Sequence, residues 1–404
     1  MAADAQAGLG AGDVEVASAV DVADLDVFSG FRLGDDDGVA EPEPAEYVKI
    51  CDVYGAGYFY IPGTETCLRI GGYVRYDAGF GDTGTFDGAR SLDVKDGKDQ
   101  GTWWKNTRFT LKTWTGQETE LGTLKTYTEL RFNFGNSASD TGAGNYPANN
   151  NAGNHANMEF AWIQLGGLRV GLDESAFDTF VGYAGNVIND TLVPYGGFDT
   201  NVVQYYFDAG NGFSAVASLE EGSGGASNPS GNYGIGTIDS YVPHVVGGVK
   251  YTQGWGDIVG VVAYDSNYES VSGKVRVDFN VTKEFSLFGM VGYGSTNHLD
   301  DNSYFANANG RGFYKPWGGS WAFWAGGTYK FNEKTSFNLQ VSGDQWKDYG
   351  IAANVAYTPV PGFTITPEVD FQRVGSGAID AGNVWAGAQK KNNVAGIIRF
   401  ERDF

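Results

Sequence analysis

The sequence contains no apolar stretch long enough to cross a membrane as a helix. Such a helix needs about 20 consecutive apolar residues, whereas the longest apolar runs, such as residues 258–264, have the length of a strand. The mean hydropathy of −0.28 is that of a soluble protein. A β-barrel with a polar lumen gives the same value, because lipid-facing and lumen-facing residues alternate along each of its strands.

Basic residues, histidine and cysteine are scarce. The 27 Lys and Arg residues are outnumbered by 49 Asp and Glu residues, which argues against a nucleic-acid partner, because phosphate binding needs clustered cations. His155, His244 and His298 lie far apart and show no metal-ligand spacing, and two cysteines do not make a zinc site. We therefore expect no metal, no cofactor and no enzymatic activity. An outer-membrane phospholipase or protease built on a barrel is the catalytic alternative.

The N-terminus lacks the basic and apolar regions of a secretory signal, so no signal peptide is visible. Residues 1–46 instead hold twelve acidic residues and a single basic one, Arg32. This composition is typical of a disordered arm. No Pro-rich or charged linker interrupts the rest of the chain. We expect an acidic arm over 1–46 and one domain over 47–404.

Alternation with a period of two residues runs through the chain and indicates β-strands. Glycine, at 61 of 404 residues, is about twice as frequent as usual and suits tight turns between such strands. A representative run opposes Val275, Val277 and Phe279 to Lys274, Arg276 and Asp278. Sixteen segments fit this pattern: 68–78, 104–115, 123–134, 157–165, 168–173, 202–208, 212–220, 243–252, 255–265, 273–282, 284–293, 320–331, 335–344, 348–357, 362–373 and 393–404.

The lengths of the connections alternate as well. Those after even-numbered segments have only a few residues, whereas most of those after odd-numbered segments are long and rich in Gly, Asn, Asp and Ser. The connections at 266–272 and 345–347 are exceptions. Short turns at one end and long loops at the other are typical of outer-membrane barrels. The sequence therefore predicts an all-β fold, a transmembrane antiparallel β-barrel of about sixteen strands in the bacterial outer membrane.

Both ends of the expected barrel carry further signals. The last segment alternates and ends in Phe404, a pattern that barrel-insertion machinery commonly reads. Cys51 and Cys67 flank a Gly- and Tyr-rich stretch. In an oxidising periplasm they can form a disulfide, which in the loop-entropy model is worth roughly 3 kcal/mol. The alternative is a pair of reduced, buried thiols.

Residues 46–77, EYVKICDVYGAGYFYIPGTETCLRIGGYVRYD, closely resemble the opening of the alphaproteobacterial porin family of the Brucella and Rhizobium type. The resemblance continues through DESAFD at 173–178 to the last strand, whereas residues 1–45 do not share it. It implies a sixteen-stranded homotrimeric porin, surrounded by outer-membrane lipid and lipopolysaccharide, whose third loop folds into the lumen. The expected function is a water-filled passive diffusion channel for ions and small hydrophilic solutes.

A barrel of this size leaves an aqueous lumen, so we looked for residues that narrow it. The third long connection, 174–201, mixes apolar residues with Glu174, Asp178, Asp190 and Asp199, and we expect these acids on the loop side of a constriction. Basic residues near the middle of the first three strands, Arg75, Arg108, Lys112 and Arg131, are expected on the opposite wall. Acids and bases that face each other across an opening create a transverse field.

Several alternatives stay open at this point. The third connection could be an ordinary surface loop, and the basic side chains could simply solvate a wide lumen. The protein could be a substrate-specific channel, which would show saturable block by its solute. It could also be a non-conducting surface or adhesin barrel, or, least favoured, a secreted soluble β-protein.

Overall fold

The computed structural model describes residues 49–81, 89–135, 155–222, 236–295, 312–375 and 391–404. The acidic arm expected over 1–46 lies outside these ranges, as does His298. Among the described residues, no helix is long and apolar enough to cross a membrane.

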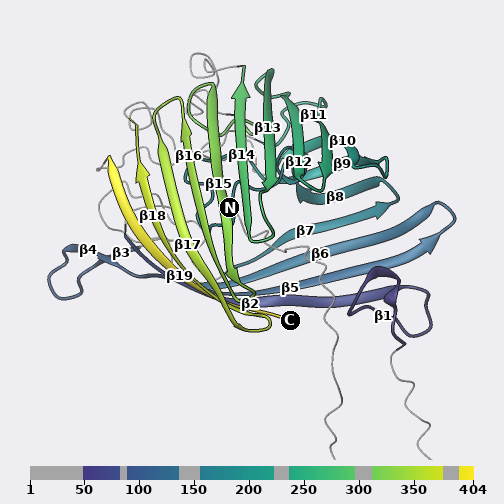
Figure 1. Ribbon diagram of the computed structural model, residues 1–404, viewed down its shortest axis with the longest axis horizontal. Helices are drawn as coiled ribbons and strands as arrows, with labels where there is room; N and C mark the ends of the chain where they lie inside the picture. The colour runs from purple at the N-terminus through teal and green to yellow at the C-terminus, as the bar shows by residue number, and fades with distance from the viewer. Residues whose placement is uncertain (1–48, 82–88, 136–154, 223–235, 296–311, 376–390) are drawn as a thin grey trace, which may run out of the picture.

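Sixteen strands form one closed antiparallel β-barrel (Figure 1). Each strand pairs with the next along the chain, and the last, β19, pairs with the first, β2, which closes the ring. The strands are β2 (Cys67–Gly81), β5 (Trp104–Thr119), β6 (Gly122–Gly135), β7 (His155–Leu165), β8 (Leu168–Glu174), β9 (Asp199–Asp208), β10 (Phe213–Gly222), β11 (His244–Gln253), β12 (Gly256–Asp265), β13 (Ser270–Asn280), β14 (Phe285–Gly294), β15 (Trp321–Asn332), β16 (Thr335–Asp344), β17 (Tyr349–Val360), β18 (Phe363–Arg373) and β19 (Asn392–Asp403).

Each of the sixteen expected segments coincides with one barrel strand, so the predicted fold class is confirmed. The connections 120–121, 166–167, 254–255 and 361–362 are short turns, as expected. Four small elements were not expected: the 3-10 helix η1 (Asp52–Tyr54), β1 (Phe59–Tyr60), and the hairpin of β3 (Ala89–Leu92) and β4 (Asp99–Thr102). That hairpin lies within the connection 79–103 and extends beyond the barrel at the left of Figure 1.

Alternating exposure gives the barrel two faces. On β18, Val369 is 62% exposed, whereas its neighbours Glu368 and Asp370 are buried. On β13, Val275 is exposed and Lys274 is buried. Because the sheet is closed, the apolar residues form its outer, lipid-facing surface and the other set forms its inner face. Tyrosines at strand ends, such as Tyr264 and Tyr357, are exposed on the outer face, where interfacial aromatic residues are usual.

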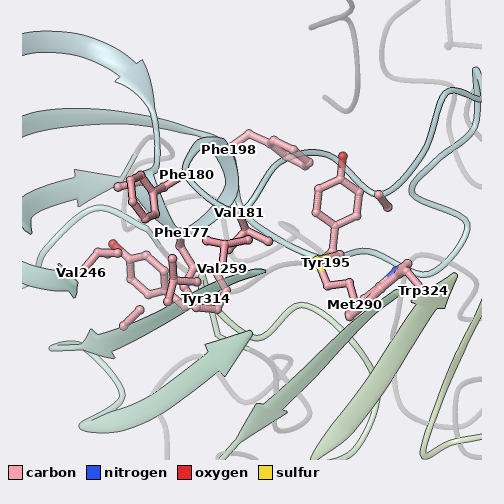
Figure 2. Packing of buried hydrophobic residues seen from close by; sticks show 14 of the residues in the cluster. Phe177, Phe180, Val181, Tyr195, Phe198, Val246, Val259, Met290, Tyr314 and Trp324 are labelled. Carbon is pink, nitrogen blue, oxygen red and sulfur yellow. The ribbon is translucent and has the colours of Figure 1, made fainter. Parts of the chain in front are cut away.

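Along one arc of the barrel, from β10 to β15, several inner positions hold apolar side chains in place of polar ones. Val216, Val259, Val261, Met290 and Trp324 occupy inner positions there, and all five are buried. They form one apolar cluster with side chains of the connection after β8 and of the segment around residues 313–317, and Figure 2 shows these side chains pointing toward one another. Since these segments cover the arc, its residues pack in a dry core.

The C-terminus closes against the first strand. The Phe404 backbone N–H donates to the Gly72 carbonyl at 3.0 Å, and the Gly72 N–H donates to the Phe404 carbonyl at 3.1 Å. Gly72 has φ of +154°, and a Cβ there would lie 1.9 Å from the Thr110 carbonyl oxygen. Glycine is required at this position because the backbone of the neighbouring strand passes so close.

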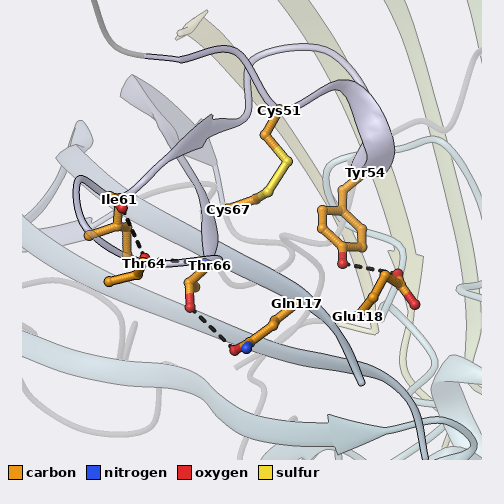
Figure 3. Close-up of a disulfide and its surroundings, with 8 residues drawn as sticks. All are labelled: Cys51, Tyr54, Ile61, Thr64, Thr66, Cys67, Gln117 and Glu118. Carbon is orange, nitrogen blue, oxygen red and sulfur yellow. Dashed lines mark hydrogen bonds between the residues drawn. A yellow bond between two sulfur atoms is a disulfide. The ribbon is translucent and has the colours of Figure 1, made fainter. Parts of the chain in front are cut away.

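The two cysteines form the expected disulfide. Cys51 and Cys67 are bonded, with their Cα atoms 6.0 Å apart, and both are buried (Figure 3). The bond joins the segment containing η1 and β1 to the start of β2. The Tyr54 hydroxyl also donates to Glu118 at 2.9 Å, which ties this segment to the end of β5.

We predict that replacing both cysteines by serine loosens this segment but leaves the barrel intact. Closing a loop of this length contributes about 3 kcal/mol, whereas the ladders of the barrel do not include the bond. Hydrogen exchange of residues 58–60 should accelerate strongly, with little change in β6 or β18. Unchanged exchange in the segment, or unfolding of the whole barrel, would contradict this.

Candidate channel constriction

The third long connection, residues 175–198, begins with a short capped helix. In α1 (Ala176–Thr179) the Ser175 side chain accepts a hydrogen bond from the Phe177 N–H at 3.0 Å. The Glu220 carboxylate on β10 accepts from the Ser175 hydroxyl at 2.6 Å and from the Ala176 N–H at 2.9 Å. The Tyr314 hydroxyl donates to the same carboxylate at 2.8 Å. Glu220 therefore holds the start of the connection against β10.

Beyond α1 the connection has irregular backbone, and wall side chains from β15 to β18 supply its hydrogen bonds. The Glu368 carboxylate accepts from the N–H groups of Ile188 and Asn189 at 2.6 and 2.7 Å. Four side chains donate to backbone carbonyls: Trp324 to Val193, Gln340 to Asp190, Asn354 to Asn186, and Gln372 to Leu192, at 2.6 to 3.0 Å. Buried backbone groups need such partners, and here the barrel wall provides them.

A buried ion pair provides a further contact between the connection and the wall. Lys274 Nζ on β13 lies 2.6 Å from Asp178 Oδ1, and both side chains are 0% exposed. The same ammonium group donates to the Tyr195 carbonyl at 2.9 Å. Desolvation raises the pKa of Asp178, and the charge of Lys274 opposes this shift. Asp178 is therefore an anchor of the connection and has no contact with water.

Two of the other three acids expected at the constriction, Asp190 and Glu174, are also withdrawn from water, and Asp199 is only partly so. Asp190 is buried and accepts from the Tyr195 hydroxyl at 2.5 Å. Burial raises the pKa of Asp190 to about 8, and nearby Glu368 adds to the shift. Glu174, the last residue of β8, is buried and accepts from the Tyr183 hydroxyl. Asp199 is half-buried and lies opposite Glu174 in the β8–β9 register.

The four expected basic residues lie together on β2, β5 and β6, and acids lie beside most of them. Arg131 pairs with Glu129 at 2.8 Å and with Glu159 at 2.9 Å. The remaining contacts of this wall are Arg75 with Glu401 at 2.5 Å, Lys112 with Glu129 at 3.5 Å, Arg399 with Asp77 at 2.8 Å, and Arg108 with the Asn133 side chain at 2.8 Å. We call this set the paired wall.

The acidic members of the paired wall and Arg399 were not singled out from the sequence. Asp77, Glu129 and Glu401 lie an even number of residues away from the basic residues of their own strands. The alternation of the sequence therefore already placed them on the same face of the sheet. The pairing of a given acid with a given base depends on the register between neighbouring strands. Alternation along one strand does not predict this register. In ring order, β13 lies opposite β5, but the strands that contact the connection continue to β18, which only β19 separates from β2. Ile188 of the connection also packs with Trp104 of β5 and Ile397 of β19.

The described residues contain no group of three or more His, Cys, Asp or Glu side chains that could hold a metal ion. His155 and His244 begin different strands, β7 and β11. His244 is buried, with Nε2 2.7 Å from the Gly236 carbonyl oxygen. Its surroundings are those of a structural histidine.

A closed sixteen-stranded antiparallel barrel with an apolar outside and a polar, charge-lined inner arc defines a channel-forming protein of the outer membrane. The family model of the "Porin subfamily" matches residues 36–397. The chain is 48% identical over 380 residues to the porin Omp2b of Brucella suis and to that of Brucella melitensis, covering 93% of this chain and 95% of each relative. The chain belongs to this porin family and is an outer-membrane porin.

Two solved structures share the fold. The channel DcaP of Acinetobacter baumannii matches with a TM-score of 0.58 at 16% identity, covering 85% of this chain and 99% of that chain. OprB of Pseudomonas putida matches with a TM-score of 0.55 at 11% identity, covering 83% and 94%. The family match begins at residue 36. The expectation that residues 1–45 depart from the family is therefore wrong for residues 36–45.

We predict that Lys274→Met releases the connection from the wall. Removing one partner of a buried ion pair costs about 3–5 kcal/mol, because the other charge stays buried alone. Hydrogen exchange of residues 176–182 should rise, and the single-channel current should become noisier. Adding Asp178→Asn should restore most of the protection, since no charge is then left unpaired. A double variant as mobile as the single one would contradict this explanation.

A second prediction concerns pH. The pKa of Asp190 is about 8 in the folded protein and about 3.9 in an unfolded chain. Between these values Asp190 is protonated while the connection is packed against the wall and ionised once the connection is released. The free energy of releasing the connection therefore falls as the pH rises from about 4 to about 8, and then levels off. Intrinsic-rate-corrected hydrogen exchange of residues 187–195 should increase over this range. Asp190→Asn should flatten the profile, whereas Asp208→Asn, at an exposed site, should not.

Proposed function

We propose that the protein forms a water-filled channel for ions and small hydrophilic solutes, narrowed by residues 175–198. The observation that carries the proposal is the set of hydrogen bonds from wall side chains to this connection. Glu368, Gln340, Asn354 and Gln372 all belong to the face opposite the exposed apolar one. A segment held by these side chains lies inside the ring of strands and narrows the passage.

The acids and bases of this passage contribute in different ways. The paired wall carries charges of both signs side by side, so it offers polar contacts to ions and hydroxylated solutes and little to apolar ones. We propose that Glu174, Asp178 and Asp190 hold the connection in place, because each is buried and bonded to it or to its anchor. Asp199, which is only partly buried, and Arg75, Arg108, Lys112 and Arg131 are the proposed groups nearest the solute by their place on the inner face, with Arg75, Arg108 and Arg131 themselves less than a tenth exposed.

We further propose that the porin works as a homotrimer in contact with lipopolysaccharide, and that it has no enzymatic activity. Family membership supports all three, since the family implies a trimeric channel. A substrate-specific channel is the second candidate. The observation that favours it is a small polar cavity beside residues 183–186, which is lined by charges of both signs.

Reconstitution in a planar bilayer tests the function directly. We expect stepwise ohmic conductance, and no conductance would overturn the proposal. Arg131→Gln should leave Glu159 uncompensated and Glu129 with Lys112 alone, and shift the reversal potential toward cation preference. A unit charge at about 4 Å in water is worth about 1 kcal/mol, or about a fivefold change in the permeability ratio. Lys283→Gln, at an exposed turn, is the control and should leave the ratio unchanged.

A further inference from the structure

A small polar cavity lies between the connection and the wall. It has a volume of about 260 Å³, below the roughly 300–1,000 Å³ of cavities for drug-sized ligands. Tyr183, Gly185 and Asn186 line it from the connection, and Arg276 and Asp278 from β13. Ser286 and Thr328 add hydroxyl groups from β14 and β15. The cavity suits a hydrophilic molecule the size of a small amino acid.

The charged pair in this cavity keeps hydrogen-bonding capacity. Arg276 Nε and Nη2 donate to the two oxygens of Asp278 at 2.6 and 2.8 Å, and Nη1 donates to the Tyr183 carbonyl. A guanidinium has five N–H donors and a carboxylate about four acceptor positions, so both groups can bind a further partner. The Asp278 side chain is 31% exposed and Arg276 is 11% exposed.

Two more inner-face charges adjoin this pair on the neighbouring strands. Lys250 on β11 and Asp257 on β12 interact electrostatically with Arg276 and Asp278. Neither Lys250 nor Asp257 forms an ion pair within the part of the chain that the structure describes. Asp257 lies directly opposite Asp278 in the ladder. Such like-charge neighbours destabilise a sheet, so stability does not explain the placement.

The four charges are sorted by sign. Lys250, Val259 and Arg276 form one cross-strand row, because Val259 pairs with both neighbours. Asp257 and Asp278 form the next row, two residues along the strands toward the short turns. Two residues of strand span about 7 Å. The result is a fixed dipole of zero net charge, which gives little net attraction to a simple ion but orients a solute that carries both charges.

We propose that this cavity is a binding subsite for small zwitterionic solutes, of which free α-amino acids are the simplest class. The solute carboxylate faces Arg276, and its ammonium group faces Asp278. Lys250, which lies over the Phe180 ring at 5.0 Å, and Asp257 stand behind them outside the lining and add to the field of the same sign. Asn186, Ser286 and Thr328 contact the polar remainder. The inference rests on the proposed channel function, because the solute reaches the cavity only through the lumen.

The test measures uptake of labelled L-alanine and of glycerol into proteoliposomes. L-Alanine uptake should saturate in the wild type, and glycerol uptake should not. The double variant Lys250→Met with Asp257→Asn keeps the net charge of the lumen and removes half of the dipole. It should raise the half-saturating concentration of L-alanine about fivefold, because charges outside the lining act on the solute through space and not by direct contact, and leave glycerol uptake unchanged. Asp257→Asn alone should give a smaller shift in the same direction.

Potassium chloride conductance separates this inference from the channel itself. No conductance in the wild type would overturn the proposed function. Normal conductance with non-saturable L-alanine uptake, or with unaltered half-saturation in the double variant, would overturn the subsite. Parallel changes for L-alanine and glycerol would also overturn it, because a site for zwitterions has to distinguish the two. The control variant Lys283→Met with Glu284→Gln, in the exposed turn after β13, should match the wild type.

Discussion

Every backbone N–H and C=O group at membrane depth must find a partner within the protein, because lipid offers none. In this chain the requirement is met by closing the sheet, with β19 paired to β2 along their length. The same requirement reaches the terminal residue, where Phe404 and Gly72 exchange two backbone hydrogen bonds. Once the ring is closed, each strand has one face toward lipid and one toward the interior, and alternation in the sequence follows.

The constraint also governs the interior. A connection with irregular backbone brings unpaired polar groups with it, and in this barrel the wall side chains satisfy them. Glu368 binds two successive N–H groups, and Gln340 and Gln372 bind carbonyls. Polar residues at inner positions therefore have two roles. Some form the ion pairs of the paired wall, and others hold the connection.

The sequence allowed the strands to be predicted because alternation and turn length are local properties. All sixteen expected segments became barrel strands, and Cys51 and Cys67 paired as expected. Contacts between distant segments could not be predicted in this way. The position of Lys274 in the alternating pattern predicts a side chain that faces solute, yet Lys274 pairs with Asp178. No local pattern in the sequence predicts that contact. Likewise, Val259 and Val261 occupy inner positions within an apolar run, and the segments that cover them come from distant parts of the chain.

The net charge of −22 says little about the passage itself. Half of it resides in residues 1–46, outside the described barrel. On the paired wall, the cations Arg75, Lys112, Arg131 and Arg399 are balanced by the carboxylates Asp77, Glu129, Glu159 and Glu401. The remaining cation, Arg108, lies among them. A passage lined in this way acts on solutes through the arrangement of its charges more than through their sum. Under the proposed channel function, solutes that carry separated charges of both signs are the ones that such a lumen distinguishes from neutral molecules of the same size.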